Sequence, residues 1–503
     1  MPSSTTHTPP ARAVDGKLRT AAWALLAVNL ARLLLGFGFE LVPQEAYYFF
    51  WAQHPALSYF DHPPAIAYAL WLSSALFGKS VFAIRFTAFA LTAGTQLAFL
   101  SLARRFLPRA RRRTAFLLLA TTPMVTLVSL VSTPDVPLLL FWTLSLLFLH
   151  DAIFRGRQRA WLAAGLFMGL AFDAKYSAAF LQVGLAAFLL ASPRHRGLLK
   201  TRGPYLALLV AHLAILPVYV WNAQHEFLSF LFQTKERAIA APPGLTLRFF
   251  FGLVGSQTAL LLPPLLFALV GALVRLGPRI VLRPRRTRER PLFLLCFLVP
   301  MVVPFTALSL FAQVKPNWLY PSYLAGTLLV AALATRRVLR WNLALSAVFH
   351  AVAALEVLFY FVPLRSDDTW FGWRELARQV EARHAADPKA FLFSADSYKT
   401  TAELAFYLPN DRIWGENVLG FPALEYDFIP GPPYELIGQD AIWLDSAPLD
   451  STPERAHKVP QPRNFEDCVQ QEPILIRHRG AIVRKYFVYR CRGFRGPYYE
   501  GNP

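Results

Sequence analysis

The sequence predicts a polytopic α-helical membrane protein with a soluble α/β domain at its C-terminal end. Hydrophobic residues make up 55% of the 503 residues, and charged residues only 16%. A soluble protein has about a quarter charged residues, and a disordered chain combines low hydrophobicity with high charge, so composition argues against both classes. Three cysteines exclude a disulfide scaffold and a cysteine-rich zinc module.

The net charge of +20 is distributed unevenly along the chain. Residues 363–503 hold 17 basic and 20 acidic residues, a net charge of −3, whereas residues 1–362 carry +23. A basic chain can bind nucleic acid, but here arginine clusters separate long apolar runs, which is typical of membrane helices with basic loops. We therefore expect a disordered cytoplasmic tail over 1–19, a membrane domain over 20–362 and a soluble domain over 363–503.

The apolar runs set the expected number of membrane spans. A helix that crosses a membrane needs about 20 mostly apolar residues. We place 11 spans at 20–39, 81–103, 114–132, 136–154, 160–173, 177–192, 203–222, 248–274, 291–311, 319–335 and 341–362. The apolar segment 64–77 is too short for a span, so we expect a helix that lies in the interface or re-enters the membrane. It belongs to a first external loop over residues 40–80.

The distribution of basic residues supports this choice. Alternate loops hold 26 Lys and Arg, at 12–19, 104–113, 155–159, 194–202, 275–290 and 336–340. The opposite loops hold only Lys79, Lys175, Lys235, Arg237, Arg248 and Lys315. By the positive-inside rule, the first set and the N-terminus lie in the cytoplasm. An odd number of spans then places residues 363–503 outside.

Polar residues gather in the external loops, at the membrane boundary. The candidates for a site are Glu45, Asp61, His62, Asp135, Lys175, Tyr176, His225, Lys315 and Asn317, with Tyr47, Tyr48 and Trp318 as aromatic neighbours. Ionisable groups at membrane depth are costly to bury, and they indicate function by default. Their accumulation on one membrane face predicts a site there.

Several of these residues also fit a purely structural role. Glu45 fits the N-terminal turn of a helix, where the dipole favours an acid. Asp135 follows a proline and fits a helix cap. The segment Asp61–Pro64 fits a rigid turn, and His225 fits an ordinary turn residue. Taken singly, none of these residues decides between a structural and a catalytic role.

The basic and aromatic residues leave the same choice open. Lys175 and Lys315 fit anchors whose ammonium groups reach the membrane interface. Tyr47, Tyr48 and Trp318 could stack on sugar rings or pack at the interface, and aromatic residues are common in interface packing.

The motifs in these loops resemble a known group of enzymes. The first loop, from Glu45-Ala-Tyr-Tyr48 through Tyr59-Phe-Asp-His-Pro-Pro64, resembles that of the bacterial polyprenyl-phosphate-sugar glycosyltransferases. This membrane group has the GT-C fold, is assigned to glycosyltransferase families 39 and 83, and includes relatives of the protein O-mannosyltransferases and of the lipid A aminoarabinose transferase. Further matching segments follow in the same order: Thr133–Pro137, Lys175–Tyr176, Trp221–His225, Ser229–Phe230 with Gln233, Lys315–Trp318 and Ala402–Pro409. The resemblance covers essentially residues 20–445.

The resemblance implies a cell-envelope enzyme of the bacterial inner membrane, with its C-terminal domain in the periplasm. Such an enzyme moves a sugar from a polyprenyl-phosphate carrier, such as an undecaprenyl phosphate, to an acceptor hydroxyl on the periplasmic side, with inversion. The acceptor is lipid A, another glycan or a protein. The expected partners are this donor, the acceptor and membrane lipids, and not nucleic acid. We predict no cofactor and no required metal, because Asp61 and His62 alone provide too few ligands for one.

The resemblance has one departure, which affects the assignment of the catalytic base. The group usually has an Asp-Glu pair where this chain has Gln44-Glu45. We therefore expect Glu45 first, and Asp135 second, as the general base, a role worth about two to four orders of magnitude in rate. The leaving phosphate needs positive charge rather than a proton. The candidates for contact with the donor phosphate or sugar are Asp61, His62, Lys175, Tyr176, His225, Lys315 and Asn317.

The soluble domain should contain both helices and strands. We expect helices over 373–384 and 400–407, strands over 390–394 and 441–444, and a hairpin of 473–477 with 481–489. Cys468 and Cys491 flank this hairpin, so an oxidising periplasm would allow a disulfide between its ends, the alternative being two free thiols. Cys296 lies inside a predicted span, where we expect it to pack.

Two other classes of function stay open at this point. A transporter would also have many spans and charged residues in the membrane, although it predicts polar residues near the midplane and often repeated halves. A protein that binds a lipid carrier without catalysis is the other class, and the neutral Gln44 would fit it.

Overall fold

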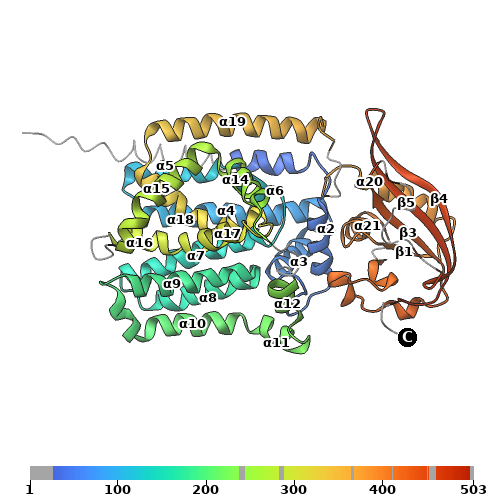
Figure 1. Cartoon of the computed structure of the whole chain (residues 1–503), viewed down its shortest axis with the longest axis horizontal. Coiled ribbons are helices and arrows are strands. Elements are labelled where there is room, and N and C mark those ends of the chain that lie inside the picture. The colour runs from blue at the N-terminus through green and yellow to red at the C-terminus, as the bar shows by residue number, and fades with distance from the viewer. Residues whose placement is uncertain are drawn as a thin grey trace, which may run out of the picture.

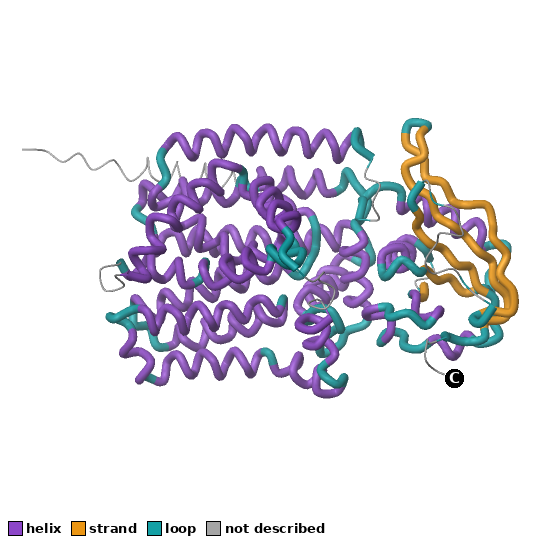
Figure 2. Tube along the Cα trace, in the orientation of Figure 1, coloured by secondary structure: helices purple, strands orange, loops and turns teal. Residues whose placement is uncertain are grey.

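A computed structural model describes residues 27–236, 244–282, 288–363, 368–409, 412–449, 451, 460 and 462–498. Helices form a bundle along the long axis of the molecule, and a sheet with its own helices lies at one end of that bundle (Figures 1 and 2). The tail predicted over 1–19, the start of the first predicted span and part of the basic loop 275–290 fall outside the described residues.

The bundle follows the predicted runs. Its main helices are α2 (Pro43–Gln53), α3 (Ala65–Phe77), α4 (Val81–Phe106), α5 (Arg109–Ala120), α6 (Pro123–Leu130), α7 (Asp135–Phe154), α8 (Arg159–Ala174), α9 (Ala179–Ala191), α10 (Arg202–Ala214), α11 (Leu216–Gln224), α12 (Leu228–Leu231), α14 (Leu247–Leu261), α15 (Pro263–Leu282), α16 (Glu289–Cys296), α17 (Val299–Leu308), α18 (Tyr320–Leu333) and α19 (Arg336–Phe359). Short 3-10 helices η1 (Tyr176–Ala178), η2 (Arg196–Lys200) and η5 (Pro316–Leu319), and the π-helical turn η3 (Phe232–Glu236), connect some of them.

The helices support a multi-pass membrane protein. Among the described residues, 4 helices are long and apolar enough to cross a membrane, or up to 7 if each bent pair is one span. The predicted number of 11 is higher because several runs form helices shorter than a full crossing. For example, α8 has 16 residues and α18 has 14, against the roughly 20 that a perpendicular span needs. The 13-residue helix α3 coincides with the segment predicted not to cross.

The prediction of one continuous span over 248–274 is wrong. The chain forms two helices there, α14 and α15, and their axes differ by 114°. The break lies at Leu262, which has a φ of +68° and precedes Pro263 and Pro264. A residue before proline is disfavoured in the α conformation, and proline has no N–H to continue the helix. The apolar pattern alone did not reveal this turn.

Small residues bring two helices of the bundle into close contact. A Cβ added at Gly165 of α8 would lie 2.3 Å from the carbonyl oxygen of Ala207 of α10. One turn later, a Cβ at Gly169 would lie 2.6 Å from the carbonyl oxygen of Ala211. Small residues at four-residue spacing allow this approach of two backbones, as is common between membrane helices.

The C-terminal part, which we name the sheet region (Trp373–Phe494), is a mixed sheet with helices. Its elements are α20 (Trp373–His384), β1 (Phe391–Ser394), α21 (Lys399–Tyr407), β2 (Ile413–Trp414), β3 (Ala441–Ala447), β4 (Phe465–His478) and β5 (Ala481–Phe494). The strand order is β2-β1-β3-β5-β4. β1 is parallel to β2 and β3, whereas β5 is antiparallel to β3 and β4. The predicted helices and strands are present, and β2 was not predicted.

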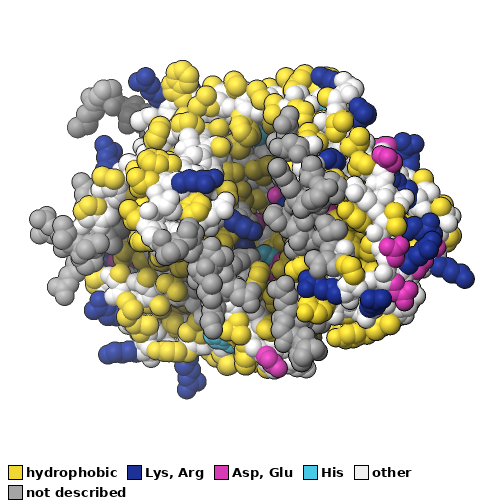
Figure 3. Space-filling view, turned by 45° about the vertical axis from the view of Figure 1, so that its right-hand side comes forward, with side chains coloured by type: hydrophobic (Ala, Val, Ile, Leu, Met, Phe, Trp, Pro, Cys, Tyr) yellow, Lys and Arg dark blue, Asp and Glu magenta, His cyan; other side chains and the backbone are white. Residues whose placement is uncertain are grey.

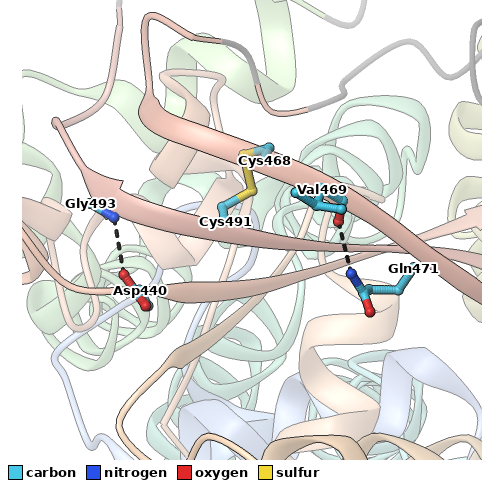
Figure 4. The surroundings of a disulfide bond; sticks show 6 residues. All are labelled: Asp440, Cys468, Val469, Gln471, Cys491 and Gly493. Carbon is cyan, nitrogen blue, oxygen red and sulfur yellow. Dashed lines mark hydrogen bonds between the residues drawn. A yellow bond between two sulfur atoms is a disulfide. The ribbon is translucent and has the colours of Figure 1, made fainter.

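The hairpin of the sheet region is longer than predicted, which changes the position of its cysteines. Cys468 and Cys491 lie directly opposite each other in β4 and β5 and form a disulfide (Figure 4). They therefore lie within the two strands, three residues from the open end of the hairpin, rather than outside it. The first half of β4 contains the polar residues Glu466, Asp467 and Gln470, so it lacks the apolar pattern that predicts a strand.

The sheet region is attached to the bundle through the first loop. Glu40 accepts hydrogen bonds from the backbone N–H groups of Trp373, at 2.5 Å, and Arg374, at 3.2 Å, at the start of α20. This is where a helix dipole favours an acid. Nearby, Lys79 donates to the carbonyl oxygen of Ala405 in α21 over 2.9 Å. Helix α2 thus lies between the bundle and the sheet region (Figure 1).

Candidate functional site

The predicted site residues gather at the end of the bundle that faces the sheet region. The loops before α7, after α8, around α12 and before α18 all reach this end, next to α2. Figure 3 shows a hollow near the middle of one face, in which basic, acidic and histidine side chains lie among apolar ones. Within this end, the structure arranges the predicted residues in three clusters.

The first cluster, the Asp135 cluster, consists of Asp135, Lys175 and Asn317. The ammonium of Lys175 lies 2.9 Å from Asp135 Oδ1, and the Asn317 amide donates to Asp135 Oδ2 over 2.6 Å. Asp135 begins α7, Lys175 follows the last residue of α8, and Asn317 lies in η5. Three predicted loops therefore meet at one carboxylate. Both of its oxygens are engaged, and Asp135 is only 3% exposed.

The second cluster, the Glu45 clamp, consists of Glu45, Arg85 and the backbone of Ser132. Glu45 Oε2 pairs with Arg85 Nη2 at 2.8 Å, and Oε1 accepts from the Ser132 N–H at 3.1 Å. Oε2 also accepts from the Val42 N–H at the start of α2, over 3.3 Å. The side chain of Glu45 is fully buried. Burial raises the pKa of Glu45, while Arg85 and the two N–H groups oppose this rise.

The Glu45 clamp differs from the expectation that Glu45 is accessible as a base. Its carboxylate joins α2 to α4 and to the loop before α7, and it has no exposed surface. The partner Arg85 was not among the predicted site residues, although an arginine inside the apolar run 81–103 is a signal of a buried charge pair.

The third cluster, the Asp61 cluster, consists of Asp61, Tyr47 and Gln233. The Tyr47 hydroxyl donates to Asp61 Oδ1 over 3.4 Å, and the Gln233 amide donates to the Asp61 carbonyl oxygen over 2.5 Å. Gln233 lies in the π-helical turn η3, a kind of distortion that is frequent at functional sites. Tyr47 stacks on Tyr398 of the sheet region, with ring centroids 4.4 Å apart.

The sheet region contributes two acids to this cluster that sequence reasoning missed. Glu425 accepts from the Phe60 N–H over 2.7 Å, and its own N–H donates to the Tyr47 hydroxyl over 3.1 Å. Burial raises the pKa of Glu425 well above its usual value, with Asp61 and Asp427 adding to the effect. Burial also raises the pKa of Asp427 to about 6. Their distance from Asp61 in the sequence explains why no local pattern indicated them.

Tyr176 lies beside the Asp61 cluster. Its hydroxyl is 2.6 Å from the Ser229 hydroxyl, and Asn222 and Ser58 lie close to it. The charge of Asp61 also acts on Tyr176. Because Tyr176 directly follows Lys175 in the chain, this residue pair connects the Asp135 and Asp61 clusters.

The remaining predicted residues lie around these clusters. His225 ends α11, stacks on Trp221 at 4.0 Å and contacts the Trp221 carbonyl oxygen through Nδ1 at 2.7 Å, as a turn residue would. His62 lies 6.2 Å from the ring of Tyr48. Lys315 is exposed at the start of η5. Trp318 packs against Phe305, with ring centroids 5.2 Å apart, rather than standing clear as a platform for a sugar.

The described residues contain no group of three or more His, Cys, Asp or Glu side chains arranged to hold a metal ion. The site brings together carboxylates, ammonium groups, amides and phenols. Such groups can bind a phosphate and sugar hydroxyls and can move a proton.

The fold and the gathered loops define this chain as a multi-pass membrane protein of the GT-C fold. Crystal structures of ArnT from Cupriavidus metallidurans, one bound to undecaprenyl phosphate and one in the apo state, superpose with a TM-score of 0.62 at 17% identity. The bound structure matches 93% of this chain and 98% of that chain. At this identity, the likeness establishes the fold.

Sequence comparisons confirm the resemblance found in the loops. The family described as dolichyl-phosphate-mannose-protein mannosyltransferase matches residues 61–221. The lipid A galacturonosyltransferase RgtD of Rhizobium johnstonii is 28% identical over 418 residues, which is 80% of this chain and 85% of that protein. The chain is thus similar to membrane glycosyltransferases in its sequence as well as in its fold.

Proposed function

We propose that this protein transfers a sugar from a polyprenyl-phosphate carrier to an acceptor hydroxyl, with inversion at the anomeric carbon. The observation that carries the proposal is the meeting of the loops at one end of the bundle. They bring Lys175, Asp135 and Asn317 into one cluster, next to the Asp61 cluster and under the sheet region. The similarity to RgtD and the fold shared with ArnT support the same reaction class.

We place the protein in a bacterial inner membrane, with residues 363–503, which include the sheet region, in the periplasm and the N-terminus in the cytoplasm. Two observations support this orientation. The end of the bundle opposite the sheet region carries the described arginine-rich loops at 104–113, 155–159, 194–202 and 336–340 (Figure 1), as the positive-inside rule requires of the cytoplasmic side. The disulfide between Cys468 and Cys491 needs an oxidising compartment.

Binding of the donor phosphate is assigned to the lysines of the site. Lys315 is exposed at the start of η5, two residues from Asn317. Lys175 has one hydrogen-bond partner among the described residues, Asp135, so its ammonium can also contact a phosphate. The leaving group is already a phosphate ester and needs positive charge rather than protonation. Asp135 and Asn317 then hold Lys175 and η5 together, which is a positioning role.

The acceptor we propose to test first is the lipid A class of glycolipid. The name of RgtD states that it acts on lipid A, and the match to this chain covers 85% of the length of RgtD. Tyr176 and Asn317 offer hydroxyl and amide groups for the hydroxyls of a donor or acceptor sugar. Glu45, fully buried in its clamp, holds α2 in place and is reassigned from base to positioning residue.

Purified protein in detergent tests the proposal directly. It would be incubated with radiolabelled polyprenyl-phosphate sugars and with lipid A from the native host. Label that moves to lipid A with inverted anomeric configuration supports the proposal. Saturable binding of polyprenyl phosphate, with neither transfer nor hydrolysis of any donor, would contradict it and identify a carrier-binding protein. A Lys175→Ala variant should mainly raise the donor concentration needed for half-maximal rate.

A further inference from the structure

Glu45, Asp135 and Asp61 have little exposed surface. Glu45 is 0% exposed, Asp135 is 3% exposed and Asp61 is 8% exposed. Glu45 and Asp135 also have both oxygens engaged by neighbouring groups. A general base must come within hydrogen-bonding distance, about 2.6–3.2 Å, of the hydroxyl that it deprotonates. A carboxylate with more exposed surface at the same end of the bundle is therefore better placed to meet the acceptor hydroxyl.

Asp368 has the accessibility that the other acids lack. Its side chain is 50% exposed, and it lies between α19 and α20, on the segment that enters the sheet region. Asp368 Oδ1 accepts from the side-chain amide of Gln44 over 3.1 Å. The ammonium of Lys399 lies 3.2 Å from the same oxygen. Gln44 is in the first turn of α2, directly before Glu45, and Lys399 begins α21.

These contacts place Asp368 beside the Asp61 cluster. Tyr398, the neighbour of Lys399, stacks on Tyr47, whose hydroxyl donates to Asp61. The charges of Asp368 and Asp61 both act on Tyr398, and the Gln44 amide is also close to it. Asp368 and Asp61 therefore flank the same aromatic pair, one at the exposed side and one at the buried side.

We propose that Asp368 is the general base of the transfer, an inference that rests on the function proposed above. The acceptor hydroxyl gives its proton to Asp368. As the proton leaves, the acceptor oxygen forms a bond to the anomeric carbon of the donor. The bond between that carbon and the phosphate oxygen breaks, and its electron pair leaves on the polyprenyl phosphate. Gln44 and Lys399 hold the carboxylate in position.

This assignment makes the active site a joint product of both parts of the chain. The lysines that meet the phosphate come from the bundle, while the base is supplied by the segment that leads into the sheet region. Docking of α21 on α2 then sets the distance between base and donor. A carboxylate in this position can be worth about two to four orders of magnitude in rate.

The test compares Asp368→Asn with a matched control in the sheet region. Asp387 is also an aspartate in an ion pair, but it lies after the end of α20 and pairs with Arg490 of β5 at 2.7 Å. With purified full-length protein, we expect Asp368→Asn to lower kcat at least 100-fold while donor KM changes less than threefold. Asp387→Asn should keep kcat within twofold of the unchanged protein.

Two further readouts separate catalysis from a loss of docking. The melting temperature and the affinity for undecaprenyl phosphate should be the same in Asp368→Asn as in the unchanged protein. In Asp368→Gly, added formate should restore part of the rate, because a small carboxylate can occupy the space of the lost one. Restoration by formate is not expected of a residue that only joins the two parts of the chain.

The outcomes distinguish this inference from the function on which it rests. If the unchanged protein transfers sugar and Asp368→Asn retains more than a tenth of its kcat, the inference is overturned and the function stands. The same holds if the variant loses activity together with lipid-phosphate binding and gains nothing from formate. If the unchanged protein neither transfers nor hydrolyses any donor, both proposals fall together.

Discussion

Helix α7 carries a buried aspartate near each of its ends, and the two have different surroundings. Asp135, at the end facing the sheet region, binds Lys175 and Asn317, which are 40 and 182 positions away in the sequence. Asp151, at the opposite end, is surrounded by arginines. Arg105 binds both of its oxygens, at 2.7 and 2.9 Å, and Arg155 and Arg157 lie 3.5 and 3.4 Å from it.

The difference shows how one helix can stabilise the fold at one end and contribute a residue to the candidate site at the other. The partners of Asp151 are charges of the positive end of the bundle, two of them within six residues of it in the chain. The arginines of this network extend to the surface, where water can solvate them. The partners of Asp135 are brought together only by folding of distant loops. A cluster of that kind is sensitive to the arrangement of the whole end of the bundle.

The largest loss of stability is expected from a change in the Glu45 clamp, beside the Asp135 cluster. Glu45→Gln leaves the guanidinium of Arg85 buried without its counter-charge, and breaking a buried pair costs about 3–5 kcal/mol. We expect a lower melting temperature and poor yield, not a folded protein with reduced turnover only. The measurement is thermal unfolding of the purified variant in detergent.

A double variant provides the control for this prediction. Changing Glu45→Gln together with Arg85→Met removes both charges, so much of the lost stability should return. A single variant that melts like the unchanged protein would show that the clamp does not contribute to stability in this way.

The next largest effect is a loss of kcat/KM, which we expect from a change at Asp135. Asp135→Asn removes the charge that holds Lys175, so we expect the ammonium to shift and the donor phosphate to be bound less well. We predict a fall in kcat/KM of about 100-fold, equivalent to about 2.7 kcal/mol. Steady-state kinetics with varied donor concentration measure it. A loss confined to acceptor KM would argue against the assigned role of Lys175.

Asp151→Asn completes the comparison at the other end of α7. The variant loses the charge that balances three arginines, but Arg155 and Arg157 are 44% and 63% exposed and remain solvated. We expect a loss of about 1–3 kcal/mol in unfolding free energy, which is less than at the Glu45 clamp. Transfer rates at low temperature should stay within twofold. A strong loss of turnover with an unchanged melting temperature would contradict the structural role of this end.

The sequence was sufficient for features that depend on local patterns. Apolar runs predicted the segments that form the bundle, although the runs 114–132, 203–222 and 248–274 each bend between two helices. The motif order identified the loops that meet in the candidate site. Long-range pairing has no such local signal. Nothing in the run around Glu45 indicates that Arg85 lies 2.8 Å away. Asp368 is 324 positions from Gln44, and no local motif indicates it in the sequence.

The break between α14 and α15 illustrates a second limit. The run 248–274 has the composition of a span, and the Pro263-Pro264 pair was the available sign of a turn. Prolines do occur inside membrane helices, because neighbouring groups can satisfy the freed backbone. The direction of the chain after Leu262 depends on packing, so the pattern of residues could not predict an angle of 114°.

The smallest of these effects concerns Glu403, a buried acid at the junction of α21 with the first loop. Both of its carboxyl oxygens are buried without a hydrogen-bond partner among the described residues. Burial raises the pKa of Glu403 well above its usual value. Glu40 and Glu45 raise it further, whereas Arg484 and Arg85 oppose the rise. The folded protein therefore keeps Glu403 in its neutral form to a higher pH than the unfolded chain does.

The raised pKa of Glu403 in the folded protein makes the free energy of unfolding fall as the pH rises. In the unfolded chain Glu403 ionises above about pH 4.3, while in the folded protein it keeps its proton to a higher pH. The folded state then binds more protons, so stability falls as the pH rises through that window, by about 1.4 kcal/mol per pH unit. Glu403→Gln cannot ionise and should lack this loss. The unchanged protein and the variant should therefore melt at similar temperatures near pH 4.5, with the variant increasingly more stable as the pH rises to 6.

Glu375 of α20 offers a matched control with the opposite sign. It is partly exposed and pairs with Arg378 at 2.8 Å, which holds the pKa of its carboxyl below the usual value. Such a group adds stability above its unfolded pKa, so Glu375→Gln should be slightly less stable than the unchanged protein at pH 6. Melting temperatures of the three proteins between pH 4.5 and 6 test both signs at once. Parallel curves for Glu403→Gln and the unchanged protein would mean that Glu403 is ionised at the junction, with Arg85 or Arg484 as its counter-charge.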